Sequence, residues 1–332
     1  MREIHLAGAY GIPEILKYNQ DRVKTPWNYP RFFPFWQIAP GAALRAFGEA
    51  APNPNAILVV INLNTKVWDV IREALPRYER KILIQLEGYQ AWKVAYENAN
   101  CFDRLINFDP NYAGHPGYQD IRLPYIPSLP SSHRDKRGLE ALLTQWKYSG
   151  RAFLDVYGLR YAPRKKKAIL IATLQKKIEV KERYSNRLEV VQRWQDWVDV
   201  YGAGWPKDLK SYRGLCVSKA DVMRRYRYAL VMENQRQPGY ISEKLMDCYL
   251  TGTVPLYWGA PDAARLVPAD TFIPIEEDTP LDRLIADDQL YQKVAQAVRR
   301  SAEEVFRAFG PEAFIHTLEG VFAKELAEKA GS

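Results

Sequence analysis

A chain of 332 residues is long enough for two domains, and 47% hydrophobic with 26% charged residues is ordinary for a globular protein, which excludes disordered and fibrous classes. The net charge of +8 indicates an anionic partner, for which nucleic acid, an anionic membrane surface and a sugar diphosphate are candidates. Because neither zinc-finger nor helix-turn-helix spacing occurs, the sequence argues against nucleic acid. Three widely spaced cysteines without a CxxC pair favour a reducing compartment.

The N-terminal half alternates short apolar runs with helical patterns. Strands are predicted over 4–7, 56–62, 81–86 and 104–107, and helices from Pro13, over 65–75 and over 89–99. This alternation is typical of a doubly wound α/β domain. Glu87 directly follows one of the strands, at the end where open parallel sheets bind ligands, although a lone glutamate there is more often a solvated loop residue.

Six aromatic residues crowd the segment 26–38, PWNYPRFFPFWQI. Its three prolines exclude a regular helix or a central strand, so we expect an irregular loop. The rings could stack on a carbohydrate or pack into the core, and core packing is favoured for most of them. A helix near 139–148 and a linker near 150–166 are expected before a second domain.

The second half opens with a predicted strand over 167–173 and a helix whose start carries a capping box, Asn186 and Glu189. Arg187 would then lie in the first helical turn, where the positive end of the helix disfavours a cation unless a phosphate is bound. The alternative is an arginine that faces solvent.

The segment 226–259 reads YRYALVMENQRQPGYISEKLMDCYLTGTVPLYWG and predicts a strand, a helix and a second strand. Such a βαβ unit implies parallel strands with a right-handed crossover. Glu233 and Asn234 stand at the carboxyl end of the first strand, and Gly252 ends the helix.

Ser242 is a favourable N-cap, which places Glu243 and Lys244 in the first turn of this helix. One hypothesis is a nucleotide-sugar site, with Lys244 on a diphosphate and Glu243 on a pair of hydroxyls. In the alternative, Lys244 pairs with Asp247 on an exposed face and Glu243 interacts with the helix dipole. Spacing alone slightly favours this alternative.

Four motifs together resemble the signature of the α-1,3/4-fucosyltransferases, glycosyltransferase family ten. They are Glu233-Asn234, Tyr240-x-Ser242-Glu243-Lys244-Leu245, Thr253-Val254-Pro255-Leu256-Tyr257-Trp258-Gly259 and Pro268-x-Asp270-Thr271-Phe272-Ile273. The resemblance implies a GT-B fold, in which two Rossmann-like domains face each other across a cleft. It also implies GDP-fucose as the donor and inversion at the anomeric carbon.

The resemblance further implies which residues act. Those expected to bind the donor are Arg187, Glu233, Asn234, Tyr240, Ser242, Glu243 and Lys244. Glu87 corresponds to the proposed catalytic base, although Gly88-Tyr89 stands where the family has Ser-Pro. No Asp-x-Asp pair occurs, so no metal ligand set is expected, and stimulation of turnover by Mn²⁺ or Mg²⁺ is left open.

The expected domains are 1–155 for the acceptor, 160–310 for GDP-fucose and a last helix, 311–332, that packs back on the first domain. The expected reaction is transfer of L-fucose to a lactose- or N-acetyllactosamine-type acceptor, with α-1,3 linkage to GlcNAc or Glc. The alternatives are a non-catalytic carbohydrate-binding protein on a GT-B scaffold, or a GT-B transferase for another nucleotide sugar.

The expected partners are therefore GDP-fucose and an oligosaccharide or glycan acceptor, and not nucleic acid. No leader is recognisable and no apolar run reaches about 18 residues, so no signal peptide or spanning helix is expected. The expected location is the cytoplasm, with peripheral contact at the inner membrane surface as an alternative.

Overall fold

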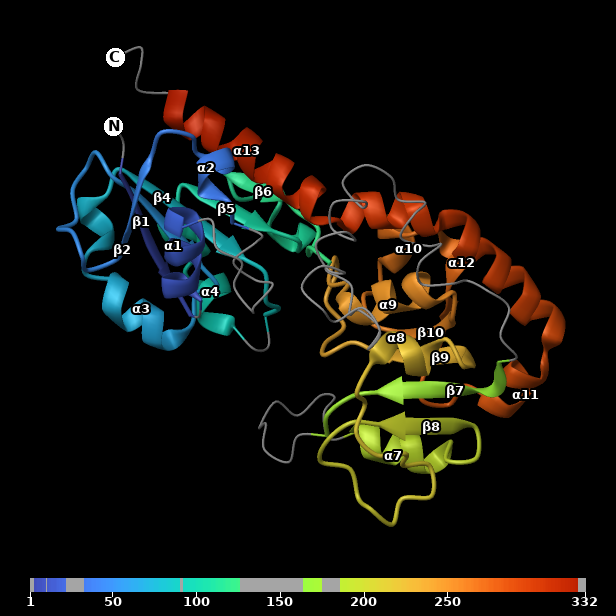
Figure 1. Cartoon of the computed structure of the whole chain (residues 1–332). Coiled ribbons are helices and arrows are strands. Elements are labelled where there is room, and N and C mark those ends of the chain that lie inside the picture. Colours follow the sequence, from blue (N-terminus) through green and yellow to red (C-terminus); the bar gives the residue numbers. More distant parts are fainter. Residues whose placement is uncertain are drawn as a thin grey trace. The chain divides into compact units, whose positions relative to one another are not determined.

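The computed structural model describes residues 3–9, 11–21, 33–89, 92–125, 164–174 and 186–327. The chain divides into two compact units (Figure 1). The first comprises residues 1–124, 237–239 and 309–332, and the second comprises 125–236 and 240–308. The expected helix near 139–148, most of the expected linker and residues 26–32 of the aromatic segment lie outside the described residues.

The first unit contains a six-stranded parallel sheet in the order β2-β1-β3-β4-β5-β6. Its strands are β1 (Glu3–Gly8), β2 (Ala43–Ala46), β3 (Ile57–Ile61), β4 (Arg80–Gln85), β5 (Arg104–Asn107) and β6 (Tyr118–Asp120). Its helices are α1 (Ile12–Asp21), α2 (Phe35–Ile38), α3 (Thr65–Ile71), α4 (Lys93–Glu97) and α13 (Pro311–Ala327), with short 3-10 turns at Leu75–Arg77, Ala99–Cys101 and Pro110–Tyr112.

The core strand of this sheet is β3, whose five apolar residues are all buried. A strand covered on both faces needs such a continuous apolar run, which is why it was recognisable in the sequence. Gly8 ends β1 beside it, and a Cβ there would lie 2.5 Å from the carbonyl oxygen of Ile61. The glycine therefore allows the close approach of the two backbones at the strand ends.

Two predicted helices of this unit are longer than the observed ones, and two of its strands, β2 and β6, were not predicted. The expected helices over 65–75 and 89–99 are shorter, since α3 ends at Ile71 and α4 covers Lys93–Glu97. Strand β2 was not predicted, because its sequence ALRA has weak β-propensity and partly exposed side chains.

The described end of the aromatic segment packs into the core. The short helix α2 follows Pro34, so the expectation that the prolines exclude a helix was wrong for its last residues. Phe33 contacts Phe314 edge-to-face, and Phe35 contacts Phe322 in the same way. Both partners belong to α13, so the aromatic segment fastens the last helix to the first unit.

The second unit contains a five-stranded parallel sheet in the order β11-β10-β9-β7-β8. Its strands are β7 (Lys165–Ile171), β8 (Val198–Tyr201), β9 (Tyr226–Met232), β10 (Val254–Trp258) and β11 (Ile273–Pro274). Its helices are α7 (Asn186–Arg193), α8 (Lys219–Met223), α9 (Glu243–Thr251), α10 (Ala263–Leu266), α11 (Leu281–Ala286) and α12 (Asp288–Phe309), with a 3-10 turn at Ala269–Thr271.

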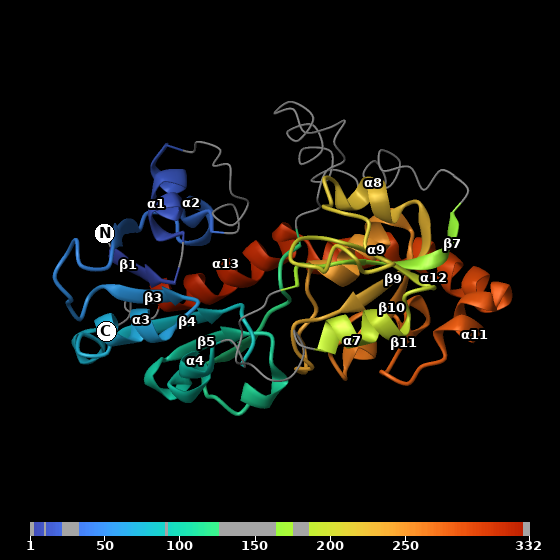
Figure 2. The ribbon, with the colours of Figure 1, turned by 90° about the horizontal axis from the view of Figure 1, so that it is seen from below.

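The chain reverses its direction of travel across this sheet between β7 and β9. From β7 it moves outward to β8, and from β9 it moves the other way to β10 and β11. Right-handed crossovers then put α7 on one face of the sheet and α8 and α9 on the other, as Figure 2 shows. The two parallel sheets with covering helices confirm the predicted α/β class with two Rossmann-like domains.

The predicted βαβ unit is confirmed as β9-α9-β10, with Leu256 of β10 in parallel register with Leu230 of β9. Ser242 caps α9, and its Oγ accepts a hydrogen bond from the N–H of Lys244. Gly252 ends the helix in the left-handed conformation, at φ 62°. These local signals explain why the element was predictable from a short stretch of sequence.

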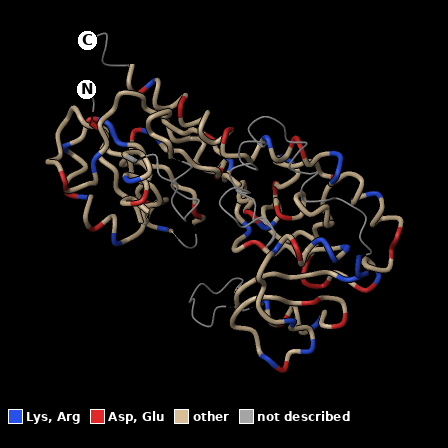
Figure 3. The backbone as a smooth tube through the Cα atoms, in the orientation of Figure 1, with Lys and Arg blue, Asp and Glu red and all other residues tan. Residues whose placement is uncertain are grey.

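Charge is distributed over both units. Figure 3 shows Lys and Arg interspersed with Asp and Glu along the described backbone.

Within the described part of the chain, no helix is long and apolar enough to span a membrane.

Candidate functional site

A pocket of about 540 Å³ opens at the carboxyl ends of β7, β8 and β9 in the second unit. It lies at the point where the strand order reverses, which is where open parallel sheets bind nucleotides. Its volume is within the range of small-molecule sites. The residues that line it are Ile171, Ala172, Thr173, Arg187, Gly202, Ala203, Leu215, Cys216, Lys219, Asn234, Glu243 and Lys244.

Among the described residues, the lining carries three cationic side chains, Arg187, Lys219 and Lys244, against one carboxylate, Glu243. Burial tends to lower the pKa of Lys244, and the positive charges of Arg187 and Lys219 act in the same direction. The carboxylates of Glu233 and Glu243 outweigh these effects and raise the pKa of Lys244 above its ordinary value. The pocket therefore presents fixed positive charge that a bound anion would stabilise.

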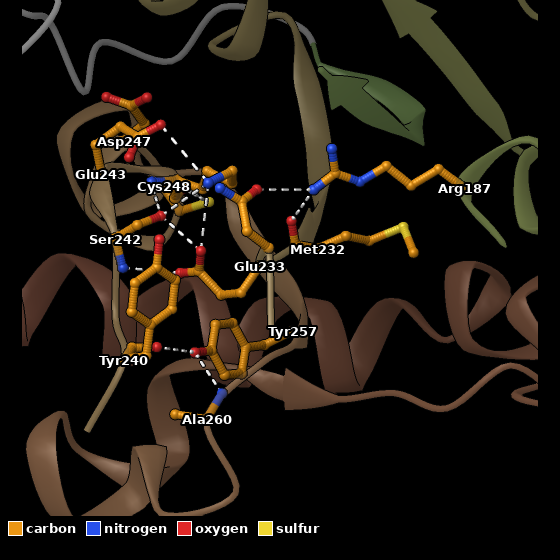
Figure 4. Close-up of polar contacts among 12 residues, drawn as sticks. Arg187, Met232, Glu233, Tyr240, Ser242, Glu243, Asp247, Cys248, Tyr257 and Ala260 are labelled. Atoms are coloured by element: carbon orange, nitrogen blue, oxygen red, sulfur yellow. Dashed lines mark hydrogen bonds and ion pairs between the residues drawn. The ribbon is translucent and has the colours of Figure 1, made fainter. Parts of the chain in front are cut away.

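Arg187 is held deep in the wall of this pocket, with 3% of its surface exposed. One guanidinium nitrogen, Nη2, donates to the carbonyl oxygen of Met232 at 2.9 Å and to Oδ1 of Asn234 at 3.3 Å (Figure 4). The alternative of a solvent-facing arginine was therefore wrong. The residue joins the first turn of α7 to the carboxyl end of β9.

Lys244 enters the pocket from the first turn of α9. Its ammonium group lies 3.4 Å from a carboxylate oxygen of Glu233 and donates to Oγ of Ser242 at 3.0 Å (Figure 4). Glu233 is fully buried and also accepts hydrogen bonds from the N–H and the hydroxyl of Ser242. The buried carboxylate thus holds both the start of the helix and its lysine.

Glu243 lies between two of the cations, 3.6 Å from Lys219 and 3.7 Å from Lys244. Burial would raise its pKa, but the two ammonium groups outweigh this effect and hold the pKa at about 2. Its side chain is half exposed, so an ionised carboxylate on the pocket wall is available to accept hydrogen bonds from hydroxyls.

The alternative pairing of Lys244 with Asp247 on an exposed face was wrong. Asp247 is buried, and it pairs with Lys219 at 3.2 Å and accepts a hydrogen bond from the hydroxyl of Tyr125 at 2.8 Å. Helix α9 is buried along most of its length, because it is packed against α8 and the sheet.

Lys219 is a pocket residue that the sequence argument missed. The signal was present, because Lys219 directly follows Ser218, the N-cap of α8, as Lys244 closely follows Ser242. The argument that a cation at a helix start suggests a nearby anion was applied to Lys244. Applied to Ser218 and Lys219, the same argument would have selected Lys219.

The structure brings Arg187, Asn234, Glu243 and Lys244 together at one pocket. The other predicted donor-binding residues, Glu233, Tyr240 and Ser242, are buried and do not line it. Tyr240 lies below them, and its carbonyl oxygen accepts the hydroxyl of Tyr257 at 3.5 Å (Figure 4). Glu233 and Ser242 both contact the ammonium group of Lys244, and direct contact of the three buried residues with a donor stays a prediction.

Gly259 closes the second strand of the motif beside Glu233. A Cβ at this position would lie 2.6 Å from Cγ of Glu233 and 2.3 Å from the hydroxyl of Tyr257. The glycine is therefore needed for the buried carboxylate to occupy its place.

Glu87 belongs to the first unit and is half-buried, just beyond the end of β4. Its carbonyl oxygen accepts hydrogen bonds from the hydroxyl of Tyr96 at 2.9 Å and from the amide of Gln85 at 3.1 Å. Gln237, also of this unit, accepts the N–H of Tyr89 at 2.8 Å. The backbone on both sides of Gly88 is thus fixed by side chains rather than by the sheet.

The residues of the pocket suit anion binding more than metal binding. Among the described residues, no group of three or more His, Cys, Asp and Glu side chains is placed to hold a metal ion. Fixed cations at a strand end suit a phosphate or diphosphate, and the adjacent carboxylate suits hydroxyl groups.

Comparison with known proteins shows a similarity between the second unit and one family. Residues 162–292 match glycosyltransferase family 10 (fucosyltransferase), C-terminal part. An alpha-(1,3)-fucosyltransferase, FucT of Helicobacter pylori, is 31% identical over 86 residues, which cover 26% of this chain and 18% of that protein. The chain thus matches less than a fifth of the length of this relative.

The fold of this chain is similar, over almost its whole length, to the folds of solved glycosyltransferases. A crystal structure of alpha1,3-fucosyltransferase matches with a TM-score of 0.59 at 14% identity, covering 97% of this chain and 90% of the other, and its complex with GDP-fucose matches with 0.54. Anabaena Alr3699/HepE, in complex with UDP and glucose, matches with 0.55 at 11% identity, covering 98% and 100%. At these identities the likeness is one of fold.

Proposed function

We propose that this chain, whose second unit carries the C-terminal domain of glycosyltransferase family 10, transfers L-fucose from GDP-fucose to a hydroxyl of a glycan. The observation that carries the proposal is the pocket at the strand reversal of this unit, whose described lining includes three cations and one carboxylate. A nucleoside diphosphate sugar supplies both chemical groups that this wall suits, a diphosphate and hydroxyls.

In the proposed reaction, an acceptor hydroxyl oxygen attacks the anomeric carbon of fucose as the bond from that carbon to the diphosphate oxygen breaks. The leaving GDP takes the electron pair, and Arg187 and Lys244 stabilise the developing negative charge. Glu243 binds hydroxyls of the donor. Asn234 holds Arg187 in place through the hydrogen bond to its guanidinium group.

The attacking hydroxyl must lose its proton, and we propose Glu87 as the base that receives it. The support is its position at the carboxyl end of β4, together with its place in the sequence pattern. A single displacement of this kind inverts the configuration at the anomeric carbon.

The proposed acceptor is of the lactose or N-acetyllactosamine type, and the proposed linkage is α-1,3.

Donor choice is tested by calorimetric titration with GDP, UDP and dTDP. GDP should bind most tightly, and R187A and K244A should each weaken it about tenfold or more, since each removes a charge-assisted contact. Lys210 provides a matched control, because it is an exposed lysine of the same unit paired with Asp196, outside the pocket. K210A should bind GDP like the wild type.

Catalysis is tested by incubation with GDP-fucose and N-acetyllactosamine or lactose, with GDP release and product linkage as readouts. A fucosylated product supports the proposal, and its linkage tests the α-1,3 assignment. GDP binding without transfer would favour a non-catalytic carbohydrate-binding protein, and preference for UDP or dTDP would favour another nucleotide sugar.

We propose that no metal is required, so turnover should persist in EDTA.

A further inference from the structure

Two lysines on the wall of the pocket are held in the same way. Lys244 lies 3.4 Å from the buried carboxylate of Glu233, and Lys219 lies 3.2 Å from the buried carboxylate of Asp247. The carboxylates expose 0% and 4% of their side chains, whereas the lysines expose 20% and 31%. Each ammonium group therefore has a buried counter-ion and a side that is open to the pocket.

The second of these pairs has a further support. The other oxygen of Asp247 accepts a hydrogen bond from the hydroxyl of Tyr125 at 2.8 Å. Tyr125 is itself buried and stacks on Phe306 of α12. The carboxylate is thus fixed on both sides, so Lys219 has one preferred position on the wall.

Glu243 connects the two pairs, because its carboxylate lies within 3.7 Å of both ammonium groups. It is one turn before Asp247 on α9, so two carboxylates project from neighbouring turns of the helix next to which a diphosphate would bind. Without Lys219, these carboxylates would repel an approaching anion. Lys219 offsets that repulsion, and its ammonium group is more exposed than the buried carboxylate of Asp247 beneath it.

We infer that Lys219 is a third donor-binding cation, directed at the diphosphate of the nucleotide sugar, and that Asp247 is the positioning residue that holds it there. This inference rests on the proposed function, because it needs a diphosphate in the pocket. It assigns to α8 the same contribution that α7 and α9 make through Arg187 and Lys244.

The experiment compares K219M with the double variant K219M/D247N. Methionine keeps most of the length of the side chain and removes the charge, which leaves Asp247 buried without its counter-ion. In the double variant, the introduced asparagine keeps an oxygen for the hydroxyl of Tyr125, and the pair leaves no buried charge without a partner. Thermal unfolding and titration with GDP, GMP and guanosine are measured for each protein.

K219M should melt at a lower temperature and bind GDP at least tenfold more weakly. K219M/D247N should regain the melting temperature but not the affinity for GDP. Guanosine should bind all three proteins within twofold, because it has no phosphate. K210M/D196N, which removes an exposed ion pair of the same unit, should leave the affinity for GDP unchanged.

Wild-type affinity for GDP in K219M/D247N would overturn the inference, since Lys219 would then serve only as a counter-ion for Asp247. An equal loss of guanosine binding would also overturn it, because the loss would come from the shape of the pocket. A wild-type protein that does not bind GDP would overturn the proposed function itself, so the two failures are distinguishable.

Discussion

The carboxylate of Glu233 accepts hydrogen bonds from both the N–H and the hydroxyl of Ser242, at 2.9 and 2.6 Å, across nine positions of the sequence. This contact ties the carboxyl end of β9 to the first turn of α9. The helix start, and with it Lys244 and Glu243, is therefore placed by a buried charge and not by the N-cap alone.

Glu233→Gln should destabilise the protein. The amide nitrogen would meet the Lys244 ammonium and the Ser242 hydroxyl in place of an acceptor, so the free energy of unfolding should fall by about 3 kcal/mol. Ser242→Ala should cost about 1 kcal/mol, the typical value for an N-cap. Urea denaturation measures both, with the exposed Glu276→Gln as a control that should stay near the wild type. A fully stable E233Q would contradict this role.

Stability should depend on the ionisation of Glu243 in acid. Its pKa is lowered from 4.5 to about 2 in the folded protein, so its ionised form stabilises the fold above pH 4.5. This contribution is lost as the pH falls from 4.5 towards 2. The stability difference between wild type and Glu243→Gln should therefore shrink across this interval, as measured by urea denaturation at several pH values. A difference that does not change with pH would rule the idea out.

Glu87→Gln should lower kcat by about a hundredfold or more, the usual loss when a general base is removed. Affinity for GDP should remain close to that of the wild type, because the residue belongs to the first unit and the pocket to the second. Glu97→Gln is the matched control, since this exposed glutamate of the same unit pairs with Lys93. If E87Q keeps normal kcat, another group is the base.

Gln237 should support the backbone next to Glu87. Its amide accepts the N–H of Tyr89 and donates to the buried carboxylate of Asp109 at 2.6 Å. Gln237→Glu should lower the melting temperature, because two carboxylates would meet. Adding Asp109→Asn restores a donor opposite the new acceptor, so the double variant should recover much of the loss. A double variant less stable than either single one would contradict the pairing.

The sequence predicted the βαβ unit because its signals are local. A buried strand reads as an apolar run, Ser242 caps the helix, and Gly252 supplies its left-handed end. Local physics also suggested Arg187 and Lys244 as phosphate ligands, since a cation at a helix start suggests a nearby anion. Spacing alone slightly favoured the other interpretation of Lys244, and the resemblance to family ten decided for donor binding. The parallel sheets followed from the alternation of strands and helices along the chain.

The partners of these residues were not predictable from the sequence. Asp247 lies three residues from Lys244, and spacing suggested that they pair, yet Asp247 faces Lys219, 28 positions away. Sequence distance determines which residues share a helix face, but the packing of α8 against α9 determines which charges meet. The burial of Glu233 and Tyr240, which do not line the pocket, was likewise not visible in the sequence, and their contact with the donor stays a prediction.

By itself the sequence determined the type of most main elements and the chemistry available at the helix starts, because these depend on neighbours within one or two turns. Only the tertiary structure decided that Arg187, Lys219 and Lys244 share one pocket, since they come from three helices on both faces of a sheet. The physical reason is that burial and charge pairing act through space. The free energy of burying a charged carboxylate such as that of Asp247 depends on the groups that surround it in space, and not on the residues next to it in the chain.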